Sequence, residues 1–542
     1  MRTSTFFLLT LVASLAVSAC GGDQTAARGG TIVIAGFADP DNLLPPLGRT
    51  LASKAVTDLL YDRLADIGPA LNTVGDAGFE PRLARSWEWS RDSLRVTFHL
   101  DPRARWHDGK PVRASDVRFA FALYTDPRVA ATGGGDISGV VDSISTSDSL
   151  TCTAWFKRKT PEQFFTLVGT LIPLPEHLLS ALSRDSIRGA TFGRQPVGDG
   201  PFRFVRWDAK SRLEIAAVDS FYRGRAKLDR VIWTIAPEMQ TATQKLLAGE
   251  ADYLEALTPP AVAQVAKVPA LRIEPYSSFD YGFLRFNLHD GASAKPHPIL
   301  GDRALRRALT QALDRRLLVR SVFDTLAHVA LGPFVRAQWT SDTTLAELSF
   351  DRGAAVRTLD SLGWREGPDG TRVKNGKPLQ LTLLRPSSSK SRELVAVLIQ
   401  EQLRQIGVMV KIEPLDFSAF MARANKRDFD AIMDAVHTNP SPAGVREAWS
   451  SSGIEKGTGP NRGGYSNPKF DAQVDSAVSS MDAHAAKTHY RAAYQTIIDD
   501  APAVWLFEPV AVAGFNKRLN VGALRADGWW LTVPAWTVGS VR

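Results

Sequence analysis

Strands and helices alternate along the second half of the chain, and this alternation limits the fold more than any other feature. Apolar runs at 282–288, 379–386 and 428–436 have the composition of buried strands, and amphipathic patterns at 302–318 and 391–406 predict helices between them. Further members of the series are predicted at 408–415 (strand), 418–426 (helix) and 490–498 (helix). Strands that alternate with helices form a mostly parallel sheet with helices on its faces, so we expect an α/β fold.

The first half of the chain is richer in strands. We predict strands at 31–37, 94–100, 202–207, 212–218 and 230–237. Helices are predicted at 53–64 and from 241 to Gly249, and a short strand follows the second helix. A further helix follows Ala114, with Ser115 as its predicted N-cap. Core aromatic residues are predicted at Trp87, Trp89, Phe98, Trp106 and Phe119. With 542 residues the chain is too long for one core, which indicates two large lobes or several domains.

The first residues have the pattern of an export signal. Arg2 precedes a short apolar run, and residues 1–19 end in Val-Ser-Ala before Cys20. This ending resembles the lipobox of bacterial lipoproteins, and the resemblance implies that the Cys20 sulfur carries a lipid. Residues 20–30 would then form a polar tether. The alternative is an ordinary export signal followed by a chance cysteine. The other cysteine, Cys152, is predicted to be buried on a strand, so a disulfide framework is excluded.

Composition and motifs argue against several classes of function. The net charge is +8, but lysine and arginine are scattered and no basic stripe interleaved with aromatic residues occurs, so we expect no nucleic-acid partner. The sequence lacks G-x-S-x-G, a P-loop and H-E-x-x-H, and its histidines are dispersed. His107 and Asp108 precede Gly109 in a predicted turn rather than forming a metal site. We therefore predict no catalytic residue, no metal site and no cofactor.

One long block carries a resemblance to a known family. Residues 81–123, "PRLARSWEWSRDSLRVTFHLDPRARWHDGKPVRASDVRFAFAL", are similar to the signature of the family 5 extracytoplasmic solute-binding proteins of ABC transporters, the peptide, dipeptide, oligopeptide and nickel class. Shorter matching blocks follow in the family's order: "PVGDGPFRFVRW", "LLAGEADY", "LRFNL", "ALRRALTQALDRRLLV", "EQLRQIGVMVKIE" and "GGYSNPKFDAQV". The match covers nearly the whole mature chain.

The resemblance implies a two-lobed clamp like the type II periplasmic binding proteins, with mixed sheets and a two-segment hinge. Lobe I would comprise residues 31–275 and 501–542, and lobe II residues 276–500. The hinge segments would lie at 274–282 and near 501–509. The implied function is a monomeric, lipid-anchored receptor outside the cytoplasm that captures a peptide or peptide-like solute and delivers it to ABC permease and ATPase subunits. The alternative is an accessory lipoprotein with a non-peptide ligand or a chaperone or sensor role.

The ligand residues are less clearly marked. Peptide binders of this family hold the solute's ammonium group with an aspartate in a lobe II loop, and here the loop reads "DAVHTNPSPAG". The aspartate position falls on or near Thr438, which argues against recognition of a peptide N-terminus unless Asp434 turns into the cleft. His437 and Asn439 offer groups that suit a neutral or anionic solute. The alternative is a rigid loop that His437 merely fills.

Four other residues are candidates, each with a structural alternative. Asp39 and Asn42 lie in the first strand-to-helix loop, which faces the cleft in this family, or they cap the segment that follows. The hydroxyl of Tyr281, at the hinge, would meet either the solute or a backbone carbonyl. Ser389 precedes a helix whose free amides suit a carboxylate, or it simply caps that helix.

Overall fold

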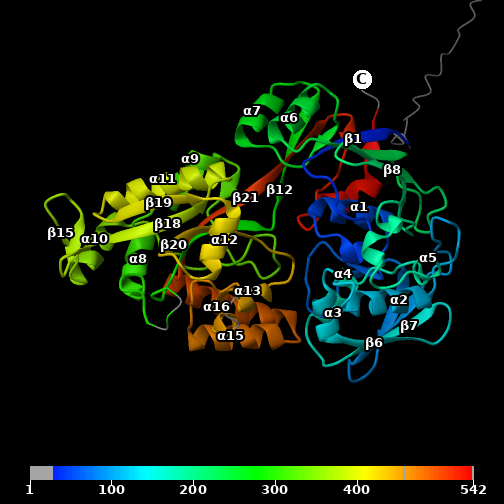
Figure 1. The fold of residues 1–542 in the computed structure, drawn as a ribbon, viewed down its shortest axis with the longest axis horizontal. Helices are drawn as coiled ribbons and strands as arrows, with labels where there is room; N and C mark the ends of the chain where they lie inside the picture. Colours follow the sequence, from blue (N-terminus) through cyan, green and yellow to red (C-terminus); the bar gives the residue numbers. More distant parts are fainter. Residues whose placement is uncertain (1–28, 292, 294, 456–458, 540–542) are drawn as a thin grey trace, which may run out of the picture.

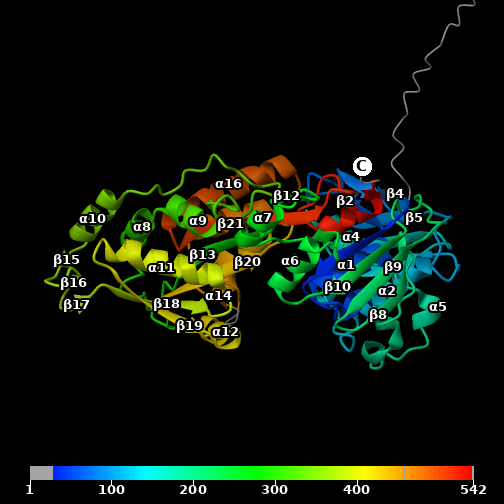
Figure 2. The same ribbon diagram turned by 90° about the horizontal axis from the view of Figure 1, so that it is seen from above.

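The computed structural model describes residues 29–291, 293, 295–455 and 459–539, which form two lobes (Figure 1). One lobe carries most of the first half of the chain and the C-terminal end, and the other carries the second half; Figure 2 shows the same division from above. Parallel and antiparallel strands share a twelve-stranded sheet that runs through both lobes. The predicted two-lobed α/β fold is therefore confirmed. The predicted export signal and Cys20 lie outside the described residues.

Three strands carry the chain between the lobes. The long strand β21 (Ala503–Asn516) pairs through residues 503–507 with β13 (Asp280–Phe286) of lobe II. Its residues 510–516 pair with β12 (Leu271–Ser277) of lobe I. The chain thus crosses twice, once between β12 and β13 and once within β21, as a two-segment hinge requires. The lobe boundaries at 275/276 and 500/501 stay predictions.

Lobe II is built on a parallel set of strands. β18 (Gln380–Pro386) pairs in parallel with β19 (Met409–Leu415) on one side and β20 (Ala431–His437) on the other, and β20 pairs with β13. The other strands are β14 (Ala327–His328), β15 (Arg365–Glu366), β16 (Arg372–Lys374) and β17 (Lys377–Pro378). The helices are α8 (Arg303–Gln311), α9 (Arg315–Phe323), α10 (Arg352–Ser361), α11 (Lys390–Arg404), α12 (Phe417–Asn425), α13 (Gly444–Trp449), α14 (Ser452–Glu455), α15 (Pro468–Ser479) and α16 (Ala483–Asp500).

Lobe I has two parts. The first extends the shared sheet with β11 (Tyr253–Leu254), β1 (Thr31–Gly36), β10 (Arg230–Ile235), β9 (Arg212–Ala217) and β8 (Phe202–Asp208), and carries α1 (Leu51–Leu60), α6 (Met239–Leu247) and α7 (Pro259–Val265). The second is an antiparallel sheet of β4 (Ala84–Trp89), β5 (Arg95–Leu100), β7 (Thr151–Phe156) and β6 (Val141–Thr146), with α2 (Ala114–Thr125), α3 (Gly134–Val140), α4 (Gln163–Thr170) and α5 (Glu176–Leu179). Two short pairs join β2 (Ala65–Ile67) to β3 (Phe79–Pro81) and β22 (Leu519–Asn520) to β23 (Thr537–Val538).

Most predicted elements agree with the structure, but two predictions were wrong. The helix predicted at 302–318 is two helices, because Asp314 stands between them and its carboxylate accepts a hydrogen bond from the Leu317 amide at 2.9 Å, which starts α9. Ser115 is not the N-cap of α2. That position belongs to Arg113, whose amide donates to the Asp116 carboxylate at 2.8 Å.

Buried aromatic and aliphatic side chains form the core of both lobes. Phe98, Trp106 and Phe119 are buried as predicted, whereas Trp87 and Trp89 are only partly buried and donate their indole N–H groups to Asp76. At the hinge, Gly282 lets the Phe507 ring approach β13 closely, since a Cβ there would come within 2.2 Å of that ring. Among the described residues, no helix is long and apolar enough to span a membrane.

Candidate functional site

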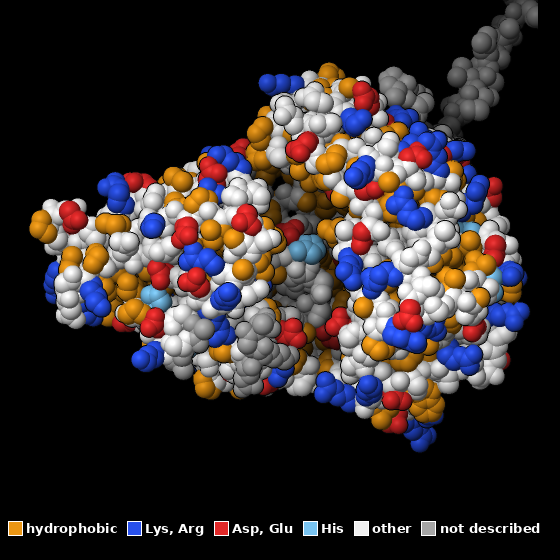
Figure 3. All heavy atoms as spheres, viewed as in Figure 1, with side chains coloured by type: hydrophobic (Ala, Val, Ile, Leu, Met, Phe, Trp, Pro, Cys, Tyr) orange, Lys and Arg blue, Asp and Glu red, His pale blue; other side chains and the backbone are white. Residues whose placement is uncertain are grey.

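The two lobes leave a hollow between them (Figure 3). In lobe II the parallel strands β18, β19 and β20 end at one edge of the sheet, where Ser387, Asp416 and Thr438 begin the following segments. Ligands of α/β proteins bind outside the carboxyl ends of such strands. The segment after β20 also touches lobe I through Ser441, as described below, so this edge faces the hollow.

Side chains from both lobes meet at one point of the hollow. The Ser441 hydroxyl of lobe II donates to the Glu162 carboxylate of lobe I at 2.6 Å. The Thr73 hydroxyl donates to the other oxygen of the same carboxylate, and the Trp339 indole of lobe II donates to the Thr73 hydroxyl at 3.2 Å. These contacts join residues that are 279 and 266 positions apart in the sequence. No motif in the sequence marks any of these four residues.

The carboxyl group of Glu162 in the lobe contact has a shifted pKa. Burial raises the pKa of Glu162, although the hydrogen bonds from Ser441 and Thr73 act to lower it. A carboxyl group whose pKa is raised in the contact stabilises the contact most when it is protonated. Its contribution is therefore full below the ordinary pKa of glutamate and is lost as the pH rises through the raised pKa.

We expect the solute-free protein to open progressively as the pH rises above the ordinary pKa of glutamate and through the raised pKa of Glu162. Small-angle X-ray scattering would record this as a growing radius of gyration. The Glu162→Gln variant should lose this part of the pH dependence, while Glu88→Gln, which changes an exposed carboxylate on β4, should keep it. A Glu162→Gln profile identical to that of the unaltered protein would contradict this role.

The end of β20 and the loop after it hold three of the predicted ligand residues. The His437 imidazole lies 3.0 Å from an Asp280 carboxylate oxygen, and this contact raises the pKa of His437, which is exposed. The Gln338 side-chain amide donates to the Thr438 hydroxyl at 3.1 Å and to the Asn439 carbonyl at 3.0 Å. The Asn439 side chain accepts from the Ser441 amide at 2.8 Å. Hydrogen bonds from Gln338 thus hold the loop in place, and the sequence did not predict this role for Gln338.

Asp434 lies on β20, before this loop, and its side chain is buried. Its carboxylate is 3.2 Å from Arg285 Nε on the neighbouring strand and 3.8 Å from Arg462 Nη1. Its other oxygen accepts from the Ala435 amide at 3.0 Å. The Asp434 carboxylate, which was a candidate partner for the ammonium group of a solute, therefore binds groups of lobe II itself.

Aromatic side chains surround Asp434 and Arg285 near the hinge. Tyr281 is buried and stacks on Phe283 with ring centroids 5.4 Å apart. Trp505 of β21 lies 5.5 Å from Phe283 and 5.0 Å from Trp449 of α13. Burial raises the pKa of Tyr281 to about 12, so its hydroxyl remains protonated at neutral pH.

The remaining predicted ligand residues make local contacts. The Asp39 carboxylate accepts from the Trp207 indole at 2.8 Å and from the Lys210 amide at 2.9 Å, which ties its loop to the β8–β9 hairpin. The Asn42 side chain accepts from the Leu44 amide at 2.8 Å. Ser389 is the N-cap of α11 and accepts from the Arg392 amide at 3.4 Å. Ser389 thus caps its helix and Asn42 makes a local turn contact, whereas Asp39 contacts a distant hairpin instead of the segment that follows it. The role of each in ligand binding stays a prediction.

In the part of the chain that the structure describes, histidine, cysteine and acidic side chains were compared with the needs of a metal centre. Among the described residues, no three histidine, cysteine, aspartate or glutamate side chains gather as a metal site would need. His107 Nε2 lies 3.0 Å from the Gly200 carbonyl, and Asp108 accepts from the Lys110 amide in the predicted turn. Cys152 is buried on β7, as predicted, and burial raises the pKa of its thiol to about 12.

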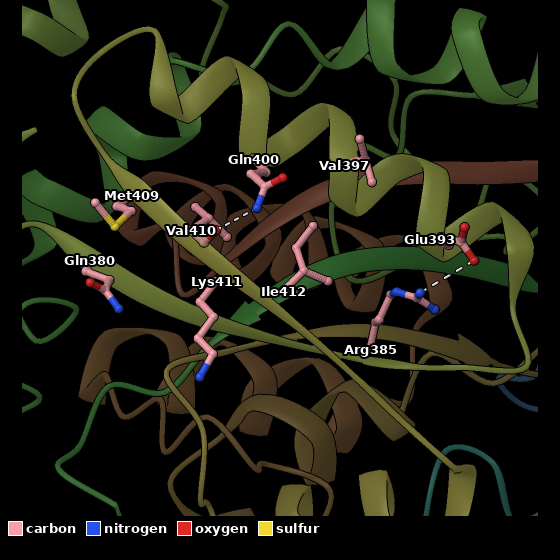
Figure 4. A pocket seen from close by; sticks show the side chains of 9 residues that line it. All are labelled: Gln380, Arg385, Glu393, Val397, Gln400, Met409, Val410, Lys411 and Ile412. Carbon is pink, nitrogen blue, oxygen red and sulfur yellow. Dashed lines mark hydrogen bonds and ion pairs between the residues drawn. The ribbon is translucent and has the colours of Figure 1, made fainter. Parts of the chain in front are cut away.

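A second hollow lies on lobe II alone, between α11 and the edge strand β19 (Figure 4). It is lined by Gln380, Arg385, Glu393, Val397, Gln400, Met409, Val410, Lys411 and Ile412. The Gln400 side chain donates to the Val410 carbonyl at 2.8 Å, which ties the helix to the strand beneath the hollow. No residue of lobe I lines it, so closure of the lobes would not enclose a solute there.

Comparison with known proteins identifies the family. Residues 78–456, more than half of the chain, match the model of the bacterial extracellular solute-binding proteins, family 5 (middle region). The chain belongs to this family. Its members bind solutes and are not enzymes. The oligopeptide-binding protein AppA of Bacillus subtilis is 25% identical to this solute-binding protein, over 98% of this chain and 99% of AppA. The probable D,D-dipeptide-binding periplasmic protein DdpA of Escherichia coli is 26% identical, over 96% of each chain.

Solved structures agree with the two-lobed fold of this solute-binding protein. AppA of Bacillus subtilis in complex with a nonapeptide superimposes with a TM-score of 0.74 at 24% identity, covering 95% of this chain and 100% of AppA. CtaP of Listeria monocytogenes, an ABC transporter substrate-binding protein, gives a TM-score of 0.80 at 22% identity, with 95% and 100% coverage. The clamp architecture is thus shared at low sequence identity.

Proposed function

We propose that this solute-binding protein captures a peptide or peptide-like solute between its lobes and delivers it to ABC permease and ATPase subunits. The contact of Ser441 with Glu162 carries the proposal, because it brings both walls of the hollow together at the carboxyl edge of lobe II. A solute beside this contact touches both lobes only when they are together. Binding therefore favours the closed state, which is the state that a permease would recognise.

The choice of peptides rests on the relatives. AppA is named as an oligopeptide-binding protein, and its solved complex holds a nonapeptide. DppA of Helicobacter pylori was solved with the peptide STSA. This chain spans nearly the full length of these proteins, so it has both walls of a comparable cleft.

The proposal includes an anchor and a quaternary state. Cys20, at the end of the predicted export signal, receives the lipid, and residues 20–30 form the tether between the membrane and lobe I. The protein acts as a monomer, since each chain supplies both halves of its cleft.

A second candidate is an accessory lipoprotein that uses the clamp for a non-peptide ligand or in a chaperone or sensor role. The engagement of Asp434 by Arg285 favours this alternative, because both oxygens of that carboxylate already accept hydrogen bonds within lobe II.

Mass spectrometry of the solute released by denaturing the purified protein tests the proposal. A pool of co-purified peptides is the expected result. If a single non-peptide solute is released, that compound and not a peptide is the cargo. An empty protein that shows no thermal stabilisation with a peptide library would contradict the transport function and support the accessory role.

A further inference from the structure

The Glu162 carboxylate stands between the two lobes without a positive partner. It accepts hydrogen bonds from the hydroxyls of Thr73 in lobe I and Ser441 in lobe II. In the part of the chain that the structure describes, no lysine, arginine or histidine forms an ion pair with it. A carboxylate offers about four acceptor sites, so these two hydroxyls leave part of its capacity unused.

Two other buried carboxylates of lobe I are neutralised by arginines. An Asp58 oxygen lies 2.6 Å from Arg63 Nη2, and an Asp62 oxygen lies 3.2 Å from Arg82 Nε. A carboxylate that is taken out of water is costly unless a cation or several hydrogen-bond donors compensate it. Glu162 has two neutral donors and no such cation.

The position of Glu162 separates it from other carboxylates that also make no ion pair among the described residues. Asp116 and Asp199 are at most 4% exposed, so a solute does not reach them. The Glu255 carboxylate accepts a hydrogen bond from the Trp529 indole of its own lobe at 2.5 Å. Glu162 instead contacts the opposite lobe, at the hollow where a solute enters.

Aromatic residues of lobe II lie next to this contact. The Trp339 indole donates to the Thr73 hydroxyl at 3.2 Å, and the Trp339 ring meets Tyr490 of α16 edge to face, with centroids 6.3 Å apart. Glu162, Ser441 and Trp339 are each partly exposed, so the contact is not sealed from the hollow. Apolar neighbours lower the local dielectric, which strengthens the attraction of the Glu162 carboxylate for a cation. Burial raises the pKa of Glu162, an effect that a neighbouring cation reverses.

We propose that Glu162, oriented by Thr73 and flanked by Trp339, forms a subsite for an alkylammonium group of the solute, and that this group holds the lobes together. An ammonium group has three N–H donors, and the carboxylate has acceptor sites left for them. A solute without a cation leaves the ionised carboxylate uncompensated in the closed state, which opposes closure. This inference rests on the proposed function and adds to it: the lobe I wall selects the positive part of the solute.

The test uses the full mature protein stripped of solute and three pools of tripeptides at neutral pH. The first pool has free amino termini and no basic side chains. The second is the same pool acetylated at the N-terminus, and the third is acetylated and contains one lysine in each peptide. Titration calorimetry should show that the first or the third pool binds at least about tenfold more tightly than the second. The pool that does so identifies whether an α-amino group or a lysine side chain fills the subsite.

Two variants separate a ligand role of Glu162 from a purely structural one. Glu162→Gln keeps the shape of the side chain and removes its charge, so it should lower the affinity of the cationic pools to that of the acetylated pool. Ser441→Ala removes the lobe contact and keeps the carboxylate, so it should keep the preference for the cationic pools. Glu88→Gln, which changes an exposed carboxylate on β4, is the matched control and should bind every pool as the unaltered protein does.

Equal binding of the three pools, or a preference that survives in Glu162→Gln, would overturn the subsite and leave the proposed function standing. If no pool binds, the peptide function fails and ethylammonium chloride becomes the probe. Thermal stabilisation by ethylammonium that Glu162→Gln abolishes and Ser441→Ala keeps would support the subsite without a peptide function. No stabilisation, or equal stabilisation of Glu162→Gln, would overturn the subsite.

Discussion

The Asp434→Asn variant is expected to lose about 3–5 kcal/mol of unfolding free energy, because it leaves a buried guanidinium without its carboxylate. Arg285 is 1% exposed, and Asp434 is its one ion-pair partner among the described residues. Arg462 stands beside the same carboxylate, so the substitution places like charges together. Urea unfolding of the purified mature protein measures the loss.

The double variant Asp434→Asn/Arg285→Met separates a structural role from a ligand role. It removes both charges, so its stability should return to within about 1 kcal/mol of the unaltered protein. If Asp434 instead held the ammonium group of a peptide, Asp434→Asn would abolish peptide binding with little change in stability. That pattern would contradict the present assignment.

The Cys20→Ser variant is expected to move most of the protein from the membrane fraction to the soluble fraction. Each buried CH₂ of a lipid chain contributes about 0.8 kcal/mol to membrane binding, so two or more acyl chains hold a protein stably and their loss releases it. Serine lacks the sulfur that would carry the diacylglyceryl group. Fractionation of cells followed by immunoblotting measures the distribution.

Cys152→Ser is the control for the anchor, since Cys152 is the other cysteine of the chain and is buried on β7. It should leave the protein in the membrane fraction. Retention of Cys20→Ser in that fraction would show that another segment binds the membrane.

The periodicity of the sequence predicted most of the sheet that carries the site. The strand predicted at 379–386 is β18 (380–386), and the predicted run 408–415 is β19 (409–415). Parallel strands that are buried on both faces have nearly continuous apolar sequences, so such runs indicate where the strands lie. The break at Asp314 went unpredicted because the helical apolar pattern continues across it, although an aspartate before "RRLL" is an N-cap signal.

The site could be predicted only in part, because its contacts join distant segments. Of the segment "DAVHTNPSPAG", only residues 438–444 follow the strand, because residues 434–437 belong to β20 itself, and the partner of Asp434 depends on the pairing of β13 with β20. Glu162 and Ser441 are 279 residues apart, and nothing local marks either of them. One signal was available: the arginine inside the apolar run "GFLRFNL" had to be buried, and a buried charge needs a partner.

Hydrogen–deuterium exchange with and without the co-purified solute tests the closing of the two lobes on a guest most directly. When the released solute fraction is returned to the stripped protein, protection should rise together at 438–441 of lobe II and at 73–75 and 161–163 of lobe I. Protection confined to one lobe, or centred on the hollow between α11 and β19, would contradict the clamp.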